Sequence, residues 1–120
     1  MAFSSFLINN VLNHVFNNDS YNPPSQLYVG LISNGSEVSG GGYSRQQISF
    51  TESTNGTITN DAEVRFPLSE SGWGTIDQAA VFTSETGGKA LDYGGLTNER
   101  LVEADDIIII LENGYKIELE

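Results

Sequence analysis

Residues 27–50 read LYVGLISNGSEVSGGGYSRQQISF, and this stretch decides the fold class. Two runs rich in aromatic and β-branched residues, Leu27–Ser33 and residues 43–50, flank a loop that contains four glycines. Such residues suit a pleated, half-buried sheet surface, and a glycine-rich loop suits a turn between strands. The stretch therefore predicts two β-strands joined by a flexible turn. A phosphate-binding loop is the alternative, but it requires a lysine and a following helix, and neither follows here.

The size and composition are those expected of one small β domain, residues 1–120. A hydrophobic content of only 38%, together with thirteen glycines, suits many short strands and polar turns. Sixteen acidic and five basic residues give a net charge of −11, which disfavours nucleic acid and anionic membranes as partners. Because the chain has no cysteine, disulfides and thiolate zinc sites are excluded. No secretory signal is expected, and the longest apolar run, residues 107–111, is too short to span a bilayer.

One amphipathic helix is predicted over residues 3–16. Its apolar residues recur at three- and four-residue spacings, and they are Phe3, Phe6, Leu7, Val11, Leu12, Val15 and Phe16. Ser4 or Ser5 can cap its start, and Pro23 and Pro24 prevent its continuation. Residues 1–26 therefore form a helix with a hinge, ahead of a sheet core over residues 27–120. The apolar stripe packs either on the domain's own sheet or on a neighbouring subunit.

Further strands follow at short spacing, and they are residues 57–66, 73–83, 89–96, 107–111 and 115–119. Asn55-Gly56 marks a reversal before the first of them, and Asn113-Gly114 is the strongest hairpin signal in the chain. Seven short strands behind one N-terminal helix predict a mainly β protein. We expect an antiparallel, jelly-roll-like β-sandwich.

No catalytic or metal site is predicted, and no cofactor. His14 is the only histidine and has no cysteine partner. Adjacent carboxylates such as Asp105 and Asp106 point to opposite faces of a strand, unlike the facing pair of a glycosidase. The Asn/Asp clusters at 18–20 and 60–63 do not match a calcium-binding loop. Trp73, the only tryptophan, is interpreted as a core anchor, with ligand stacking as the alternative. We therefore expect a protein that is not an enzyme.

Several segments resemble a family of small virion proteins encoded by tailed bacteriophages. The resemblance covers nearly the whole chain, and its glycine-rich segment is fairly specific. The matching pieces are residues 12–16, 27–31, 37–46, 66–67, 73–76, 86–91 and 95–97, followed by the C-terminal hairpin. The resemblance implies a structural part of a virion, made in the host cytoplasm, with no catalytic residues to transfer.

The leading hypothesis from this resemblance is a capsid decoration, or cement, protein on the capsid surface. It would bind the major capsid protein, bridge capsid subunits and form a homotrimer. The candidate interface residues are Phe3, Phe6, Leu7, Gly40, Gly41, Gly42 and Tyr43. The alternative is a tail or tail-fibre module that contacts other virion proteins and binds host saccharide through Trp73, Tyr43 or Tyr93. A free carbohydrate-binding domain is the third hypothesis.

Overall fold

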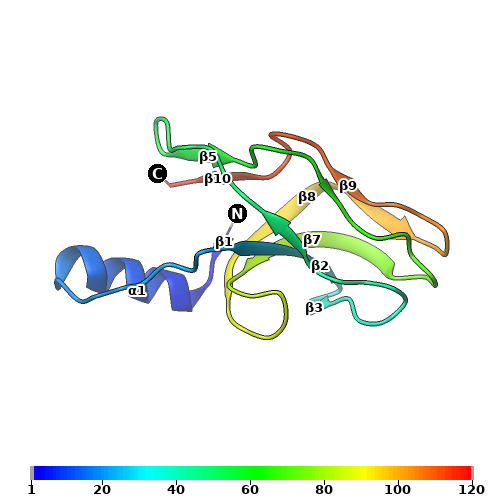
Figure 1. Cartoon of the computed structure of the whole chain (residues 1–120), viewed down its shortest axis with the longest axis horizontal. Coiled ribbons are helices and arrows are strands. Elements are labelled where there is room, and N and C mark those ends of the chain that lie inside the picture. The colour runs from blue at the N-terminus through cyan, green and yellow to red at the C-terminus, as the bar shows by residue number, and fades with distance from the viewer. Residues whose placement is uncertain (1, 120) are drawn as a thin grey trace.

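A six-stranded antiparallel sheet forms one layer of the molecule, in the order β1-β8-β7-β2-β3, with β4 also paired to β2 (Figure 1). The computed structural model describes residues 2–119, without the side chains of residue 2 and residues 95–98. The elements are β1 (Ala2–Phe3), α1 (Ser5–Phe16), β2 (Leu27–Ser33), β3 (Ser36–Glu37), β4 (Gln46–Ile48), β5 (Thr57–Thr59), β6 (Val64–Arg65), β7 (Gly74–Phe82), β8 (Ala90–Val102), β9 (Ile109–Ile110) and β10 (Lys116–Glu118).

Two short antiparallel ribbons, β10-β5 and β6-β9, form the second layer and lie over one face of the large sheet (Figure 1). Facing layers of antiparallel strands bury the side chains that point between them. The prediction of a mainly β, antiparallel sandwich with one N-terminal helix is confirmed. Residues 95–97, one of the segments that resemble the virion protein family, are among the residues whose side chains are not described.

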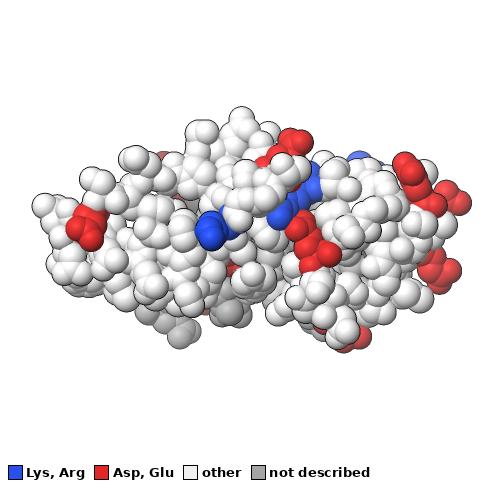
Figure 2. Space-filling model, turned by 90° about the horizontal axis from the view of Figure 1, so that it is seen from below, with Lys and Arg blue, Asp and Glu red and all other residues white. Residues whose placement is uncertain are grey.

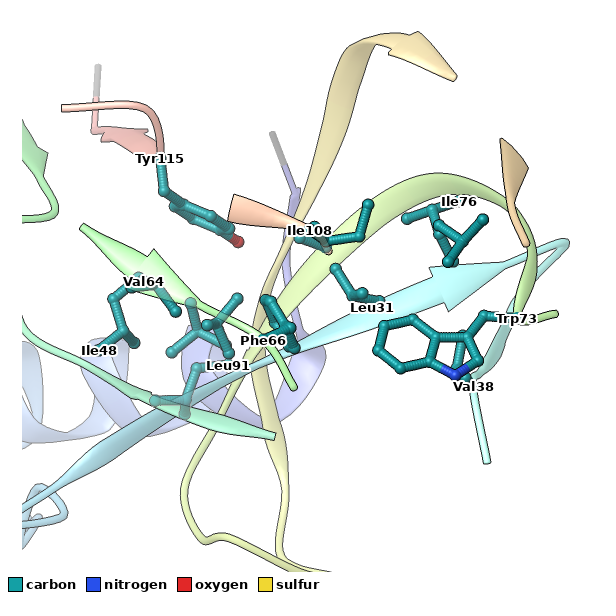
Figure 3. Close-up of a cluster of buried hydrophobic side chains, with 14 residues drawn as sticks. Leu31, Val38, Ile48, Val64, Phe66, Trp73, Ile76, Leu91, Ile108 and Tyr115 are labelled. Atoms are coloured by element: carbon teal, nitrogen blue, oxygen red, sulfur yellow. The ribbon is translucent and has the colours of Figure 1, made fainter. Parts of the chain in front are cut away.

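The core fills the space between the two layers (Figure 3). Leu31 from β2, Ile76 from β7 and Leu91 from β8 meet Phe66 and Tyr115 from the opposite layer, and all five are buried. Trp73, which directly precedes β7, leaves only 6% of its surface exposed. The interpretation of Trp73 as a core anchor is therefore confirmed.

The predicted strand at residues 43–50 is shorter in the structure, where only Gln46–Ile48 forms β4. Tyr43 turns inward instead, stacking on Phe66 at 6.3 Å and meeting Trp73 edge to face at 5.5 Å between ring centroids. Aromatic pairs of this kind stabilise a core by about 0.5–1.5 kcal/mol beyond the burial of their area, which favours the inward position of Tyr43. Strand β8 is instead longer than predicted, because it continues to Val102 whereas the predicted strand ends at residue 96.

The two Asn-Gly signals have different outcomes. At Asn55-Gly56, the backbones of Thr54 and Thr57 exchange hydrogen bonds of 3.0 and 3.1 Å, and both central residues have positive φ, as predicted for a tight reversal. Asn113-Gly114 also turns the chain, but the predicted hairpin is wrong. Strand β9 before the turn pairs with β6, and β10 after it pairs with β5.

The buried side chain of Asn60 explains this divergence. Its Nδ2 donates to the carbonyls of Ala62 and Leu111, and its Oδ1 accepts the backbone N–H of Tyr115. These bonds hold both ends of the 111–115 turn against the bend between β5 and β6. Strands β9 and β10, which would have formed the predicted hairpin, therefore pair with β6 and β5 instead. The single strand predicted at residues 57–66 is divided into β5 and β6.

Candidate interaction surfaces

Helix α1 projects from one end of the sheets, and the chain then returns beside it to β2 (Figure 1). We call residues 4–26 the arm. Ser4 caps α1, since the N–H of Leu7 donates to its Oγ over 3.2 Å, as the sequence predicts. The N–H of Ser4 donates to the carbonyl of Leu91 over 2.8 Å, which fixes the root of the arm to β8. Of the apolar residues of α1, only Leu7 packs against the core.

Apart from Leu7 and Asn10, which are half-buried, the residues of α1 are exposed, and none of them is buried. The exposed fractions are 36% for Phe6, 42% for Ile8, 39% for Val11, 48% for Leu12, 62% for Val15 and 76% for Phe16. Packing of this stripe on the domain's own sheet is therefore not what the structure shows. Ile8 also belongs to this exposed stripe, although it is not among the predicted residues.

The candidate interface residues fall in two places and are not brought together. Phe3 and Leu7 lie at the root of the arm, and Phe6 lies on the exposed part of α1. Gly40, Gly41 and Gly42 lie in the loop before β4, where all three have positive φ. The role of these six residues, and of Tyr43 beside the loop, in an interface stays a prediction.

The glycine-rich loop has a clear role inside the molecule. The indole N–H of Trp73 donates to the carbonyl of Gly41 over 2.9 Å, and the backbone N–H of Glu70 donates to the same oxygen over 2.8 Å. A Cβ on Gly41 would lie 2.6 Å from Ser71 Oγ, in a backbone conformation that favours glycine. The loop thus holds the tryptophan in place through backbone geometry.

A network of three polar side chains lies beside this loop. The Tyr43 hydroxyl donates to Glu37 Oε2 over 2.6 Å and accepts the N–H of Leu31 over 3.0 Å. Arg45 donates to both carboxylate oxygens of Glu37 over 2.8 Å. Burial by itself raises the pKa of Glu37, but the hydrogen bonds from Arg45 and Tyr43 outweigh it and hold that pKa below its ordinary value. Burial and the neighbouring carboxylate raise the pKa of Tyr43.

Arg45 also joins this network to the loop between β7 and β8. Its Nη1 donates to the carbonyls of Ser84 and Gly87 over 2.9 and 2.7 Å, and its guanidinium lies 3.6 Å above the centre of the Phe82 ring. A shallow pocket of about 320 Å³ opens between the two loops. Because its charged and phenolic groups already bind one another, the network serves to fix the loops in place.

An apolar cleft of about 220 Å³ lies at the root of the arm, between the sheet layers. Its lining residues are Phe3, Leu7, Leu27, Phe50, Ile58, Val81, Leu91, Asp92 and Ile117. Asp92 is buried there; its Oδ2 accepts the Tyr115 hydroxyl over 2.8 Å, while Oδ1 has no hydrogen-bond partner within the described residues. Burial raises the pKa of Asp92, although the bond from Tyr115 opposes this.

Charge is divided unequally between the arm and the sandwich. Of the sixteen acidic residues only Asp19 lies in residues 1–36, and all five basic residues lie beyond residue 36. Figure 2 shows the result on one face, where acidic groups gather at the end away from the arm.

No helix within residues 2–119 has the length and apolar character needed to cross a membrane. Nowhere in that range do three His, Cys, Asp or Glu side chains gather as a metal site would require.

A family model described as Podophage GP4 fiber I protein gp80 matches residues 2–118. The chain belongs to this family. A fiber I protein is a phage virion structural protein, so the resemblance seen in the sequence is confirmed. The family description fits the tail-fibre alternative better than capsid decoration. No curated protein matches the chain.

Proposed function

We propose that this fiber I family protein is a non-enzymatic structural component of a phage tail-fibre apparatus. In this role the arm attaches the domain to the assembly, and the acidic sandwich faces solvent. Its partners are other virion proteins and further copies of the chain, in a homotrimer. Residues 1–120 act as one domain, in which residues 27–120 form the folded body.

The observation that carries this proposal is the division of the molecule into two surfaces. The arm exposes large apolar side chains such as Val15 and Phe16 and holds a single charged residue, Asp19. The sandwich carries the remaining charge and has a buried apolar core, although it also exposes single apolar residues such as Leu101 and Leu111. A contiguous exposed apolar surface marks an interaction site on an otherwise polar protein. The arm is therefore suited to attachment and the sandwich to exposure.

The side chains with perturbed pKa values support a structural role. Glu37, Tyr43 and Arg45 bind one another, and Asp92 binds Tyr115, so each shifted pKa has a partner or burial as its cause. Structural ion pairs shift pKa values in the same way as catalytic groups do. The aromatic rings named for saccharide stacking also serve the core, since Trp73 is buried and Tyr43 packs against it.

Capsid decoration is the competing function, because it also requires docking on virion proteins. Labelling of intact particles distinguishes the two. Antibodies against the purified protein, coupled to gold, are expected to label the tail of negatively stained virions. Phage that lack the gene should lose this label and the corresponding fibre density. Labelling spread over the head would overturn the fibre assignment and favour decoration.

A further inference from the structure

The apolar cleft at the root of the arm has a partly exposed rim and a buried base. The rim is made of half-buried apolar residues, and these are Phe3, Leu7, Leu27, Phe50, Ile58 and Ile117. The base is made of buried residues, Val81, Leu91 and Asp92, the last of them only 1% exposed. Asp92 has the only polar side chain among these lining residues. The cleft therefore places one carboxyl group at the buried end of an otherwise apolar hollow.

The side chain of Asp92 points into the space between the two layers. Asp92 pairs with Phe3 of β1 on one side and with Val81 of β7 on the other, and cross-strand partners share one face of a sheet. Its Oδ2 accepts the hydroxyl of Tyr115, which reaches across from the opposite layer (Figure 3). Its Oδ1 is buried as well, but has no hydrogen-bond partner within the described residues. One oxygen of this carboxyl group is thus left for a ligand.

The free oxygen favours a ligand with a hydroxyl group. A buried polar atom without a hydrogen bond lowers stability, and a buried water molecule that might satisfy it needs two to four polar partners of its own. A hydroxyl group can donate to an ionised carboxylate and can accept from a protonated carboxyl group. An ammonium group would satisfy only the ionised form and would bring a second charge into an apolar site. A neutral hydroxyl therefore fits Asp92 in either protonation state.

The size and walls of the cleft define the rest of the ligand. Its volume is about 220 Å³, whereas an apolar cavity of about 150 Å³ is large enough to bind benzene. Phe3 and Phe50 lie on the rim, and Phe50 meets Tyr115 edge to face at 6.0 Å between ring centroids. An aromatic ligand would find rings to pack against there. We propose that the cleft binds a phenol, a small aromatic group whose single hydroxyl forms a hydrogen bond with Asp92 Oδ1.

This inference goes beyond the proposed function and does not depend on it, because purified full-length protein is sufficient for the test. The probe is p-cresol, titrated near neutral pH and followed by the backbone amide resonances in two-dimensional NMR spectra. We expect saturable shifts at Phe3, Leu91 and Asp92, with a dissociation constant on the order of 1 mM for so small a ligand. Toluene has the same ring without the hydroxyl, and should bind about tenfold more weakly because Asp92 Oδ1 then stays unpaired.

A variant that fills the cleft provides the second test. Ile58→Trp places a larger ring on the rim and should weaken the binding of p-cresol at least tenfold. The matched control is Leu101→Trp, which adds the same ring near the other end of β8, where the leucine is 57% exposed. It is expected to bind like the wild type. Circular dichroism verifies that both variants are folded, and if Ile58→Trp is not, the comparison of p-cresol with toluene on the wild type decides the question.

Three results would overturn the proposal. They are the absence of saturable shifts at the cleft, equal affinities for p-cresol and toluene, and binding that a folded Ile58→Trp variant leaves unchanged. A phenol has two sources, a free aromatic compound and the tyrosine side chain of another protein. N-acetyltyrosinamide distinguishes them, because it carries the ring of p-cresol on a peptide backbone. Shifts at the same cleft residues with both probes would identify a tyrosine side chain as a ligand that fits, whereas shifts with p-cresol alone would identify a free compound.

Discussion

Trp73 and Phe16 are both large aromatic residues at the end of a regular element, yet 6% of Trp73 is exposed and 76% of Phe16. Trp73 is covered by residues that lie far away in sequence, among them Tyr43 and the carbonyl of Gly41. Phe16 lies in an arm made from one continuous segment, which has only its own root to pack against. The sandwich therefore covers its core aromatic residues within the chain, whereas the arm leaves the apolar stripe of α1 exposed.

The largest effect expected is the loss of Trp73 from the core. Trp73→Ala should lower the free energy of unfolding by about 3–5 kcal/mol, because truncation of a buried aromatic residue leaves a cavity. Urea unfolding followed by circular dichroism measures this change. Trp73→Phe is the matched control: it keeps a ring but loses the hydrogen bond to Gly41, and should cost about 1–2 kcal/mol. Equal stability of Trp73→Ala and wild type would mean that this end of the sandwich is not a packed core.

The next effect concerns the ion pair that holds the loops of the sandwich. Arg45→Met should destabilise the protein by about 2 kcal/mol, less than for a fully buried pair because Glu37 is 26% exposed. The variant leaves the Glu37 carboxylate without its bidentate partner and the Ser84 and Gly87 carbonyls without their donor. A double-mutant cycle with Glu37→Gln measures the coupling. Additive effects of the two changes would show that the pair contributes nothing of its own.

This contrast between the two regions was only partly accessible from sequence. The run Leu27–Ser33 was predicted with its observed bounds, because a continuous apolar segment between turn signals is a local property. The position of Tyr43 was not, since it depends on the distant Phe66 and Trp73. The pairing after Asn113-Gly114 was missed for the same reason, because it depends on Asn60. Spacing alone located the stripe on α1, but no local signal tells whether a stripe meets its own sheet or another copy.

The half-buried Glu37 and the buried Asp92, both in the sandwich, should respond to pH in opposite directions. The pKa of Glu37 is lowered by folding, so its contribution to stability is present above the ordinary carboxyl range and is lost as pH falls through the folded value. The pKa of Asp92 is raised by burial, so its contribution is present at low pH and is lost as pH rises through the folded value. Glu37→Gln should therefore cost most near neutral pH.

Asp92→Asn keeps an acceptor for the Tyr115 hydroxyl and removes the charge. As pH rises from about 3 to 7, the free energy of unfolding of this variant should increase relative to that of the wild type, which means that the variant becomes the more stable of the two. Thermal unfolding over this range provides the measurement for both variants. Parallel pH profiles for Glu37→Gln and Asp92→Asn would refute the opposite assignments.

The smallest effect on the folded body should come from the arm. Val15→Ser with Phe16→Ser should change the free energy of unfolding in dilute solution by less than about 0.5 kcal/mol, as exposed substitutions do. At higher concentration the wild type should gain stability by mass action, reaching about 2.7 kcal/mol at 100 times the dissociation constant. Its urea midpoint, read from Trp73 fluorescence, should therefore rise with protein concentration, while that of the variant stays constant. Leu101→Ser with Leu111→Ser should keep the concentration dependence. If the arm variant instead loses the same stability at every concentration, the stripe packs on its own sandwich in solution, and the distinction between the two regions fails.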